Sequence, residues 1–201
     1  LPPSEHSIVT VGNFDGVHRG HQALLRETVS RARSTGCVSV ALTFEPHTRQ
    51  SGSTQTVYRI LSTFDEKIRL IEPLEVDYLA RIPFDDAMST KTPEEFIREI
   101  LVEKLHCRGW VMGQGHAIGV NRIGNENFLR LMEGKYHFSL FVMDLVSIGG
   151  AVVSSTLVRD RISQGRIAEA VSSLGHPYLV LVERTRGIKL GVTLGYPTLK
   201  D

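Results

Sequence analysis

Two histidines three residues apart, His18 and His21, are the residues of this sequence best suited to chemistry. They stand in the stretch GNFDGVHRGH, residues 12–21, and their spacing places both rings on one face of a helix. A helix N-terminus also offers free backbone N–H groups and the positive end of the helix dipole. Such a site suits phosphate, and imidazole donors suit the negative charge that grows on a phosphoryl group in a transition state.

The elements on either side of this stretch would hold it in place. The apolar residues 8–11 predict a strand that ends at Gly12, and the helical spacing of apolar residues predicts a helix over residues 20–35. We expect the residues of the connecting turn to carry the histidines. The turn is formed by Gly12, Asn13, Phe14, Asp15 and Gly16, and Gly20 lies at the helix start. The carboxyl end of a strand in a parallel sheet is a common place for nucleotide chemistry.

Each part of this pattern also has an ordinary structural explanation. A histidine in the first turn of a helix is more often a surface or capping residue than a catalyst. A zinc site would need a third protein ligand, and none is spaced near the two histidines. The turn matches neither the P-loop nor the GxGxxG pattern. The combination of strand, glycine-rich turn, HxGH and helix is what favours nucleotide chemistry.

A second candidate phosphate site lies near the end of the chain. Ser154 and Ser155 are suited to cap a helix, Thr156 adds a hydroxyl, and Arg159 follows one turn later. Alone, this segment is better explained as a capped helix with a surface arginine. Paired with the HxGH stretch, it favours phosphate binding.

These segments resemble one family. GNFDGVHRGH is similar to the HxGH motif of the adenylyltransferase (FAD synthetase) module of prokaryotic bifunctional riboflavin kinase/FMN adenylyltransferase. SSTLVR at residues 154–159 resembles the family's SSTxIR. FEPHTR at residues 44–49 resembles its FEPHPR, with Thr48 in place of the second proline. Further segments match in order and spacing, so the resemblance covers nearly the whole chain.

The resemblance implies an α/β fold with a doubly wound, Rossmann-like parallel sheet. It also implies that the phosphate of FMN attacks the α-phosphorus of ATP, with Mg²⁺ bridging the phosphates and no metal site of protein ligands. His18, His21 and Arg159 are then the catalytic residues. The implied ATP-binding residues are Gly12, Asn13, Phe14, Asp15, Gly20, Ser154, Ser155 and Thr156. The implied flavin-binding residues are Pro46, Gly113, Gly115 and His116.

One loop departs from the family pattern. The family reads G-x-D/N-F-R-F-G where this chain has Gly113 to Gly119. Gly115 replaces the Asp or Asn, and His116 replaces the first Phe. Ala117 replaces the Arg, and Ile118 replaces the second Phe. Both outer glycines remain, so we expect the turn to form without the family's side-chain contacts. Arg122, in the stretch that follows, is a candidate anion contact.

The remaining pattern predicts alternating strands and helices. We expect a mobile polar loop at 50–62 and a capped helix with proline at its first position from Thr92. Further strands are expected at 38–44, 76–82, 108–113, 138–146 and 178–183, and further helices at 64–72, 125–132 and 166–174.

We expect two parts in the chain. Residues 1–175 form the nucleotidyltransferase domain. Residues 176–201 resemble the start of the family's kinase barrel, with a short β remnant. A closed barrel needs on the order of 80 further residues, so we expect no riboflavin kinase activity.

Composition is that of an ordinary globular protein. The chain has 201 residues, a formal net charge of +1, 41% hydrophobic and 22% charged residues. We therefore expect no nucleic-acid partner and no membrane partner. No signal peptide is visible, and Cys37 and Cys107 are expected to be free thiols, so we expect a cytoplasmic protein. The oligomeric state is unknown.

Three functions fit the sequence. The first is FAD synthase. The second is an HxGH nucleotidyltransferase with a different acceptor, because the 113–119 loop has changed. The third is a flavin- or nucleotide-binding protein without enzymatic activity, descended from such an enzyme.

Overall fold

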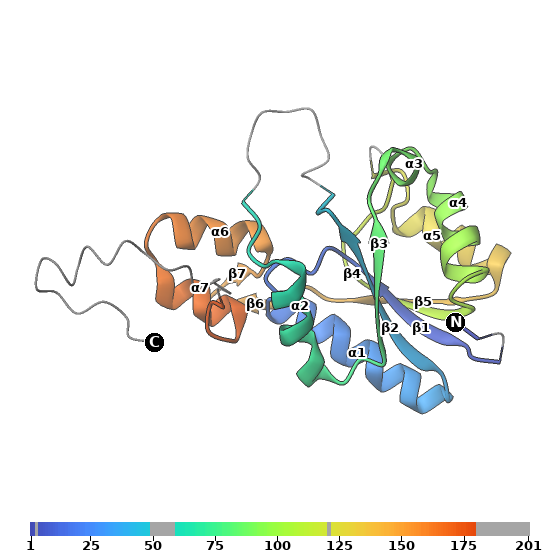
Figure 1. The fold of residues 1–201 in the computed structure, drawn as a ribbon, viewed down its shortest axis with the longest axis horizontal. Helices are drawn as coiled ribbons and strands as arrows, with labels where there is room; N and C mark the ends of the chain where they lie inside the picture. Colours follow the sequence, from blue (N-terminus) through green and yellow to red (C-terminus); the bar gives the residue numbers. More distant parts are fainter. Residues whose placement is uncertain (3, 49–58, 120–121, 180–201) are drawn as a thin grey trace, which may run out of the picture.

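A parallel sheet lies at the centre of the fold in the computed structural model, which describes residues 1–2, 4–48, 59–119 and 122–179 (Figure 1). Its strand order is β3-β2-β1-β4-β5. The strands are β1 (Ser7–Val11), β2 (Val38–Glu45), β3 (Tyr78–Pro83), β4 (Cys107–Gly113) and β5 (Ser139–Met143). The chain runs outward from β1 in one direction through β2 and β3, and in the other through β4 and β5. This is the doubly wound order. Its switch point lies between β1 and β4, where the loops that follow these two strands run in opposite directions.

Helices cover both faces of the sheet (Figure 1). Alternate residues of β1 point to opposite faces: Ile8 packs with Ala32 of α1, whereas Val9 and Val11 pack with the helical residues 96–101. One layer holds α1 (Arg19–Thr35) and α2 (Phe64–Ile71), which is followed by a 3-10 turn, η1 (Glu72–Leu74). The other layer holds α4 (Pro93–Phe96), the π-helical segment η2 (Ile97–Val102) and α5 (Glu126–Tyr136).

The chain ends its described part in two further helices, α6 (Ser155–Ser163) and α7 (Ile167–Leu174), which pack on each other. A short hairpin of β6 (Ser147–Ile148) and β7 (Ala151–Val152) leads into α6. Gly149 and Gly150 form its two-residue turn with φ of 59° and 78°, a backbone that glycine adopts without strain. This hairpin was not expected from the sequence, although Gly-Gly is one of the two-residue turns that indicate a hairpin.

The predicted elements are largely confirmed, with small differences at their ends. The third strand begins at Tyr78 and not at residue 76, because the Asp77 carboxylate accepts hydrogen bonds from the Ser39 N–H and hydroxyl, 2.8 and 2.6 Å away. The fifth strand ends at Met143 and not at residue 146, because the chain then turns into the hairpin. A short helix, α3 (Asp86–Ser89), capped by Asp85, was not expected.

Some predictions fall outside the described residues. They concern most of the 50–62 loop, residues 180–183 of the last predicted strand, and the barrel remnant beyond. Tyr178 and Leu179, the described residues of that predicted strand, are not in a strand. Among the described residues, no helix has the length and apolar character needed to cross a bilayer.

Candidate active site

The turn after β1 has an unusual backbone. Phe14 and Val17 adopt φ of 46° and 38°, a left-handed region that L-residues rarely occupy. Burial keeps them there, because both side chains are almost fully enclosed in the core between α1 and β2. The Gly16 N–H donates to Ser62 Oγ at 2.9 Å, which fixes the turn against the start of α2. The turn is therefore held in one shape before any ligand arrives.

His18 and His21 lie at the start of α1 with their rings stacked. The centroids are 3.6 Å apart and the ring planes differ by 17°. His18 is the N-cap, and its Nδ1 accepts a hydrogen bond from the His21 backbone N–H at 3.3 Å. A Cβ at Gly20 would come within 3.2 Å of the His18 ring, so glycine at this position leaves room for the stack.

Both imidazoles are neutral at pH 7. Burial lowers the pKa of His18 to about 4, against the weaker raising effect of Asp15. Burial also lowers the pKa of His21 well below its usual value, and His18, Lys67 and His116 lower it further. Because His18 Nδ1 is an acceptor, its proton must be on Nε2, where it can be donated to a ligand. Among the described residues, His21 Nδ1 is buried without a hydrogen-bond partner.

Asp15 joins the two candidate phosphate sites. Its carboxylate is buried and accepts hydrogen bonds from the backbone N–H groups of Leu61 and Ser62, at 2.8 and 3.1 Å. The other carboxylate oxygen forms an ion pair with Arg159 of α6. The Ser155 hydroxyl donates to the Asp15 carbonyl at 2.9 Å. The starts of α1 and α6, far apart in sequence, are thereby fastened together.

The start of α6 has the predicted capped form. Ser154 accepts a hydrogen bond from the Leu157 N–H at 3.2 Å, as an N-cap does. Arg159 also donates from Nε to the Arg59 carbonyl at 2.8 Å, so its guanidinium is held at the margin of the turn.

A cavity of 410 Å³ opens between these two helix starts. We call this cavity the polar cleft. Every residue predicted to be catalytic or to bind ATP lines it: Gly12, Asn13, Phe14, Asp15, His18, Gly20, His21, Ser154, Ser155, Thr156 and Arg159. The structure therefore brings together what the sequence left as two separate motifs.

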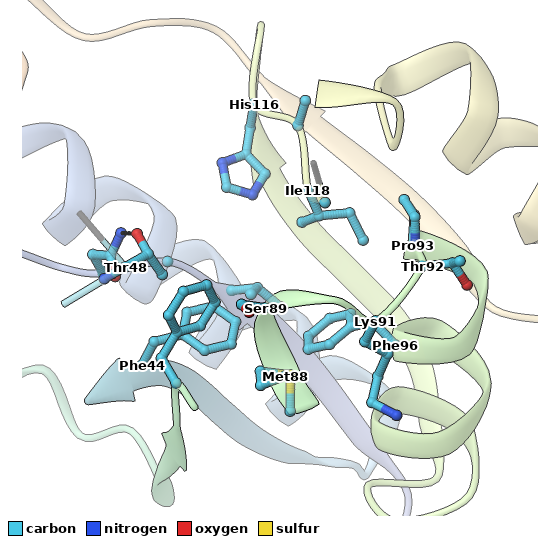
Figure 2. Close-up of a pocket in the computed structure, with 16 residues that line it drawn as sticks. Phe44, Thr48, Met88, Ser89, Lys91, Thr92, Pro93, Phe96, His116 and Ile118 are labelled. Atoms are coloured by element: carbon cyan, nitrogen blue, oxygen red, sulfur yellow. Dashed lines mark hydrogen bonds between the residues drawn. The ribbon is translucent and has the colours of Figure 1, made fainter. Parts of the chain in front are cut away.

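A second cavity of 290 Å³ lies beside it, with an apolar lining (Figure 2). We call it the apolar pocket. Phe44 at the end of β2 lies edge-on to Phe84 at 5.6 Å and tilted against Phe96 at 6.1 Å. Met88 of α3 and Pro93 of α4 complete this wall. None of these five residues was singled out from the sequence as a site residue, because apolar side chains of this kind also form ordinary core.

The residues predicted to bind flavin are divided between the cavities. Gly113 and Gly115 line the polar cleft, His116 lines both cavities, and Pro46 lines neither of them. The altered loop closes as expected: Ile118 and Gly124 exchange backbone hydrogen bonds at 3.1 and 3.0 Å. Arg122 lines the polar cleft and donates to the Gly115 carbonyl.

The two cavities share one wall. Four residues line both of them: Val11, Gly12, Asn13 and His116. A ligand with an apolar ring and a phosphate-bearing arm would therefore pass from one cavity to the other at the end of β1. As for metal ions, the described residues contain no group of three His, Cys, Asp or Glu side chains that could hold one.

Comparison with known proteins finds relatives that match most of this chain. The family model for FAD synthetase matches residues 2–157. The bifunctional riboflavin kinase/FMN adenylyltransferase of Escherichia coli (strain K12) is 33% identical over 196 residues, which cover 98% of this chain and 63% of the relative. A putative bifunctional riboflavin kinase/FMN adenylyltransferase of Geobacillus thermodenitrificans is 35% identical over 174 residues, 85% of this chain and 90% of the relative. The chain thus spans less than two thirds of the length of the Escherichia coli relative.

Solved structures show the same fold. A crystal structure named macrolide-efflux protein, from Streptococcus pneumoniae, has a TM-score of 0.81 at 23% identity. The match covers 98% of this chain and 64% of the Streptococcus pneumoniae chain. Pantoate-beta-alanine ligase from Francisella tularensis has a TM-score of 0.55 at 14% identity, covering 85% and 71%. At these identities the likeness concerns the fold alone. On the family model and the sequence relatives together, the chain belongs to the FAD synthetase family.

Proposed function

We propose that this chain is an FMN adenylyltransferase, which transfers AMP from ATP to FMN to give FAD and pyrophosphate. Membership of the FAD synthetase family supports the reaction. The observation that carries the proposal is the shared wall between the polar cleft and the apolar pocket. The reaction joins a nucleoside triphosphate to a ring that carries a phosphate arm. These two substrates need two such cavities side by side, so that their phosphates meet.

The chemistry needs stabilisation of charge more than it needs a base. A phosphate monoester is already ionised at neutral pH, because its second pKa is about 6. We assign His18 and His21 to the triphosphate, with His21 at the α-phosphate. Neutral imidazole N–H groups donate to its oxygens as negative charge grows there. An anion beside these rings would also raise their pKa values and so favour the protonated imidazolium, which is the stronger donor.

The start of α6 is assigned to the leaving group. Its first backbone N–H groups and the hydroxyls of Ser154, Ser155 and Thr156 are suited to the β- and γ-phosphates. Arg159 adds a fixed positive charge, and its ion pair with Asp15 holds it against the turn that carries the histidines. Pyrophosphate would then leave along the open side of the polar cleft.

The isoalloxazine ring is assigned to the apolar pocket. Phe44, Phe84 and Phe96 offer aromatic edges and faces, and Met88 offers a polarizable thioether. We assign Pro46, Gly113, Gly115 and His116 to the margin of this site. Mg²⁺ would be carried by the triphosphate, because the described residues offer no cluster of acidic or imidazole ligands for it.

We assign residues 1–175 to the nucleotidyltransferase domain. The last described helix, α7, ends at Leu174, and Gly175 closes it with a left-handed C-cap. The assignment of residues 176–201 to the start of a kinase-like barrel stays a prediction, because residues 180–201 lie outside the described part of the chain.

Incubation with FMN, ATP and Mg²⁺ tests the proposal, with FAD followed by chromatography and pyrophosphate by a coupled assay. We expect one pyrophosphate for each FAD. Pyrophosphate release with CTP, or with another phosphomonoester in place of FMN, would instead favour a nucleotidyltransferase with a different substrate. Tight binding of ATP without pyrophosphate release would favour a binding protein without activity.

A further inference from the structure

His116 stands where the two cavities meet. Among the four residues of the shared wall, Val11 and Gly12 have no polar side chain, so Asn13 and His116 are the polar side chains at the junction. Figure 2 shows the His116 ring reaching into the apolar pocket from the loop after β4, across from Phe44 and Thr48. Any acceptor that extends from the apolar pocket to the polar cleft passes this ring.

The two polar side chains differ in their hydrogen bonds. The Asn13 amide is committed to Thr48, because its Nδ2 donates to Thr48 Oγ1 at 2.9 Å. By contrast, Nε2 of His116 is buried and makes no hydrogen bond with any described residue. A buried polar atom without a partner costs stability, so its persistence at a substrate site points to a ligand.

We propose that His116 donates a hydrogen bond from Nε2 to the phosphate of the acceptor, and so selects a phosphorylated flavin over an unphosphorylated one. This inference rests on the proposed function. It adds a residue that positions the attacking phosphate next to the α-phosphate held at His21. The resemblance does not imply this role, since the family pattern has a phenylalanine at this position.

The electrostatics agree with a donor role. Burial, and to a smaller degree Arg122, lowers the pKa of His116 to about 4, so the ring is neutral at pH 7. A neutral imidazole has one N–H, and an acceptor phosphate beside Nε2 selects the tautomer with the proton there. His116 also lies near enough to His21 to lower its pKa, which places the two rings in one electrostatic environment.

Binding of FMN and of riboflavin, which lacks the phosphate, tests the proposal. The dissociation constants are measured by flavin fluorescence for the full chain with a nonhydrolysable ATP analogue present. We expect His116→Phe, which keeps a ring of similar size, to weaken FMN binding at least tenfold and to change riboflavin binding less than twofold. We expect His116→Gln, which keeps an N–H donor, to restore a large part of the loss.

A matched control comes from the apolar pocket. Phe84→Ala should weaken the binding of both flavins by similar factors, because it removes a contact with the ring and none with the phosphate. Equal losses for both flavins in His116→Phe would overturn the proposal, as would an unchanged affinity for FMN. If the wild-type chain forms FAD and His116→Phe binds FMN and riboflavin as tightly as the wild type does, this inference alone fails. If the wild-type chain neither binds FMN nor forms FAD, the proposed function fails with it.

Discussion

The polar cleft and the apolar pocket lie side by side but are built in different ways. The polar cleft is lined by two helix starts and fixed by hydrogen bonds, with Asp15 binding the backbone at 61–62 and pairing with Arg159. The apolar pocket is formed by side-chain packing at the ends of β2 and β3 and in two short helices. Hydrogen bonds fix positions to within tenths of an ångström, whereas apolar contacts fix mainly shape and area. We therefore expect changes in the cleft to affect mainly the rate, and changes in the pocket to affect mainly the affinity for the acceptor.

The largest effect is expected in the polar cleft. His21→Ala removes the donor that we assign to the α-phosphate, and loss of one such donor typically costs about 2.7–4 kcal/mol of barrier. Turnover should therefore fall at least a hundredfold, measured as initial rates of FAD formation. His6→Ala is the matched control, because this exposed histidine precedes β1 at the opposite end of the sheet. A near-wild-type rate in His21→Ala would remove His21 from the chemistry.

A smaller loss is expected at the joint between the two helix starts. Arg159→Lys keeps the positive charge but loses the planar fork that pairs with Asp15 and reaches the Arg59 carbonyl. We expect kcat/KM for ATP to fall about 30-fold, which is about 2 kcal/mol and typical of a hydrogen bond to a charged group. Thermal unfolding of the variant serves as the control for misfolding. An unchanged kcat/KM would show that the fork is not needed for the triphosphate.

The apolar pocket should respond in KM and not in kcat. Phe84→Ala removes aromatic surface that is in contact with Phe44 and does not touch the polar cleft. We expect KM for FMN to rise about tenfold with kcat within twofold, since the lost contact is equal in ground and transition states. Steady-state kinetics at saturating ATP measure both constants. A large fall in kcat would contradict the division of roles between the two cavities.

The last expected effect concerns stability and pH and not turnover. The pKa values of His18 and His116 in the folded chain are about 4, below 6.5 in the unfolded chain, and the pKa of His21 is also lowered. The unfolded chain then binds more protons between these values, so stability falls as the pH falls from 6.5 toward 4. Each histidine contributes at most about 1.4 kcal/mol per pH unit. Urea unfolding from pH 7.5 to 5 measures the slope.

We assign this pH dependence of stability to the buried histidines that line the polar cleft. His18→Asn should reduce it, whereas Phe84→Ala should lower stability without changing it. A slope that His18→Asn leaves intact would contradict the assignment of a neutral, buried imidazole at the helix start.

The difference between the two cavities also decides what could be predicted from the sequence. The strand-turn-helix at residues 8–35 and the capped start of α6 carry residue types with few other uses, and the predicted elements are confirmed. The doubly wound parallel sheet, which the resemblance implied, is also confirmed. The HxGH stretch and the start of α6 meet through the Asp15–Arg159 pair, which joins residues 144 apart in sequence. No local pattern contains that contact.

The apolar pocket could not be predicted in the same way. Phe44, Phe84, Met88 and Phe96 have the composition of ordinary core, and it is their tertiary arrangement that leaves a cavity between them. The resemblance pointed to Pro46 and to the 113–119 loop. Residues 116–119 of that loop line the pocket, and Pro46 does not. The shared wall at the end of β1 is likewise a product of topology, because it needs the loops after β1 and β4 to part at the switch point.

The central claim is that the polar cleft holds the triphosphate of ATP while the apolar pocket holds the flavin ring. A crystal structure of the chain with a nonhydrolysable ATP analogue and FMN tests it most directly. We predict the α-phosphate within hydrogen-bond distance of His21, the β- and γ-phosphates at the start of α6, and the isoalloxazine ring between Phe44 and Phe84. A triphosphate bound away from both helix starts, or a flavin ring outside the apolar pocket, would contradict the account.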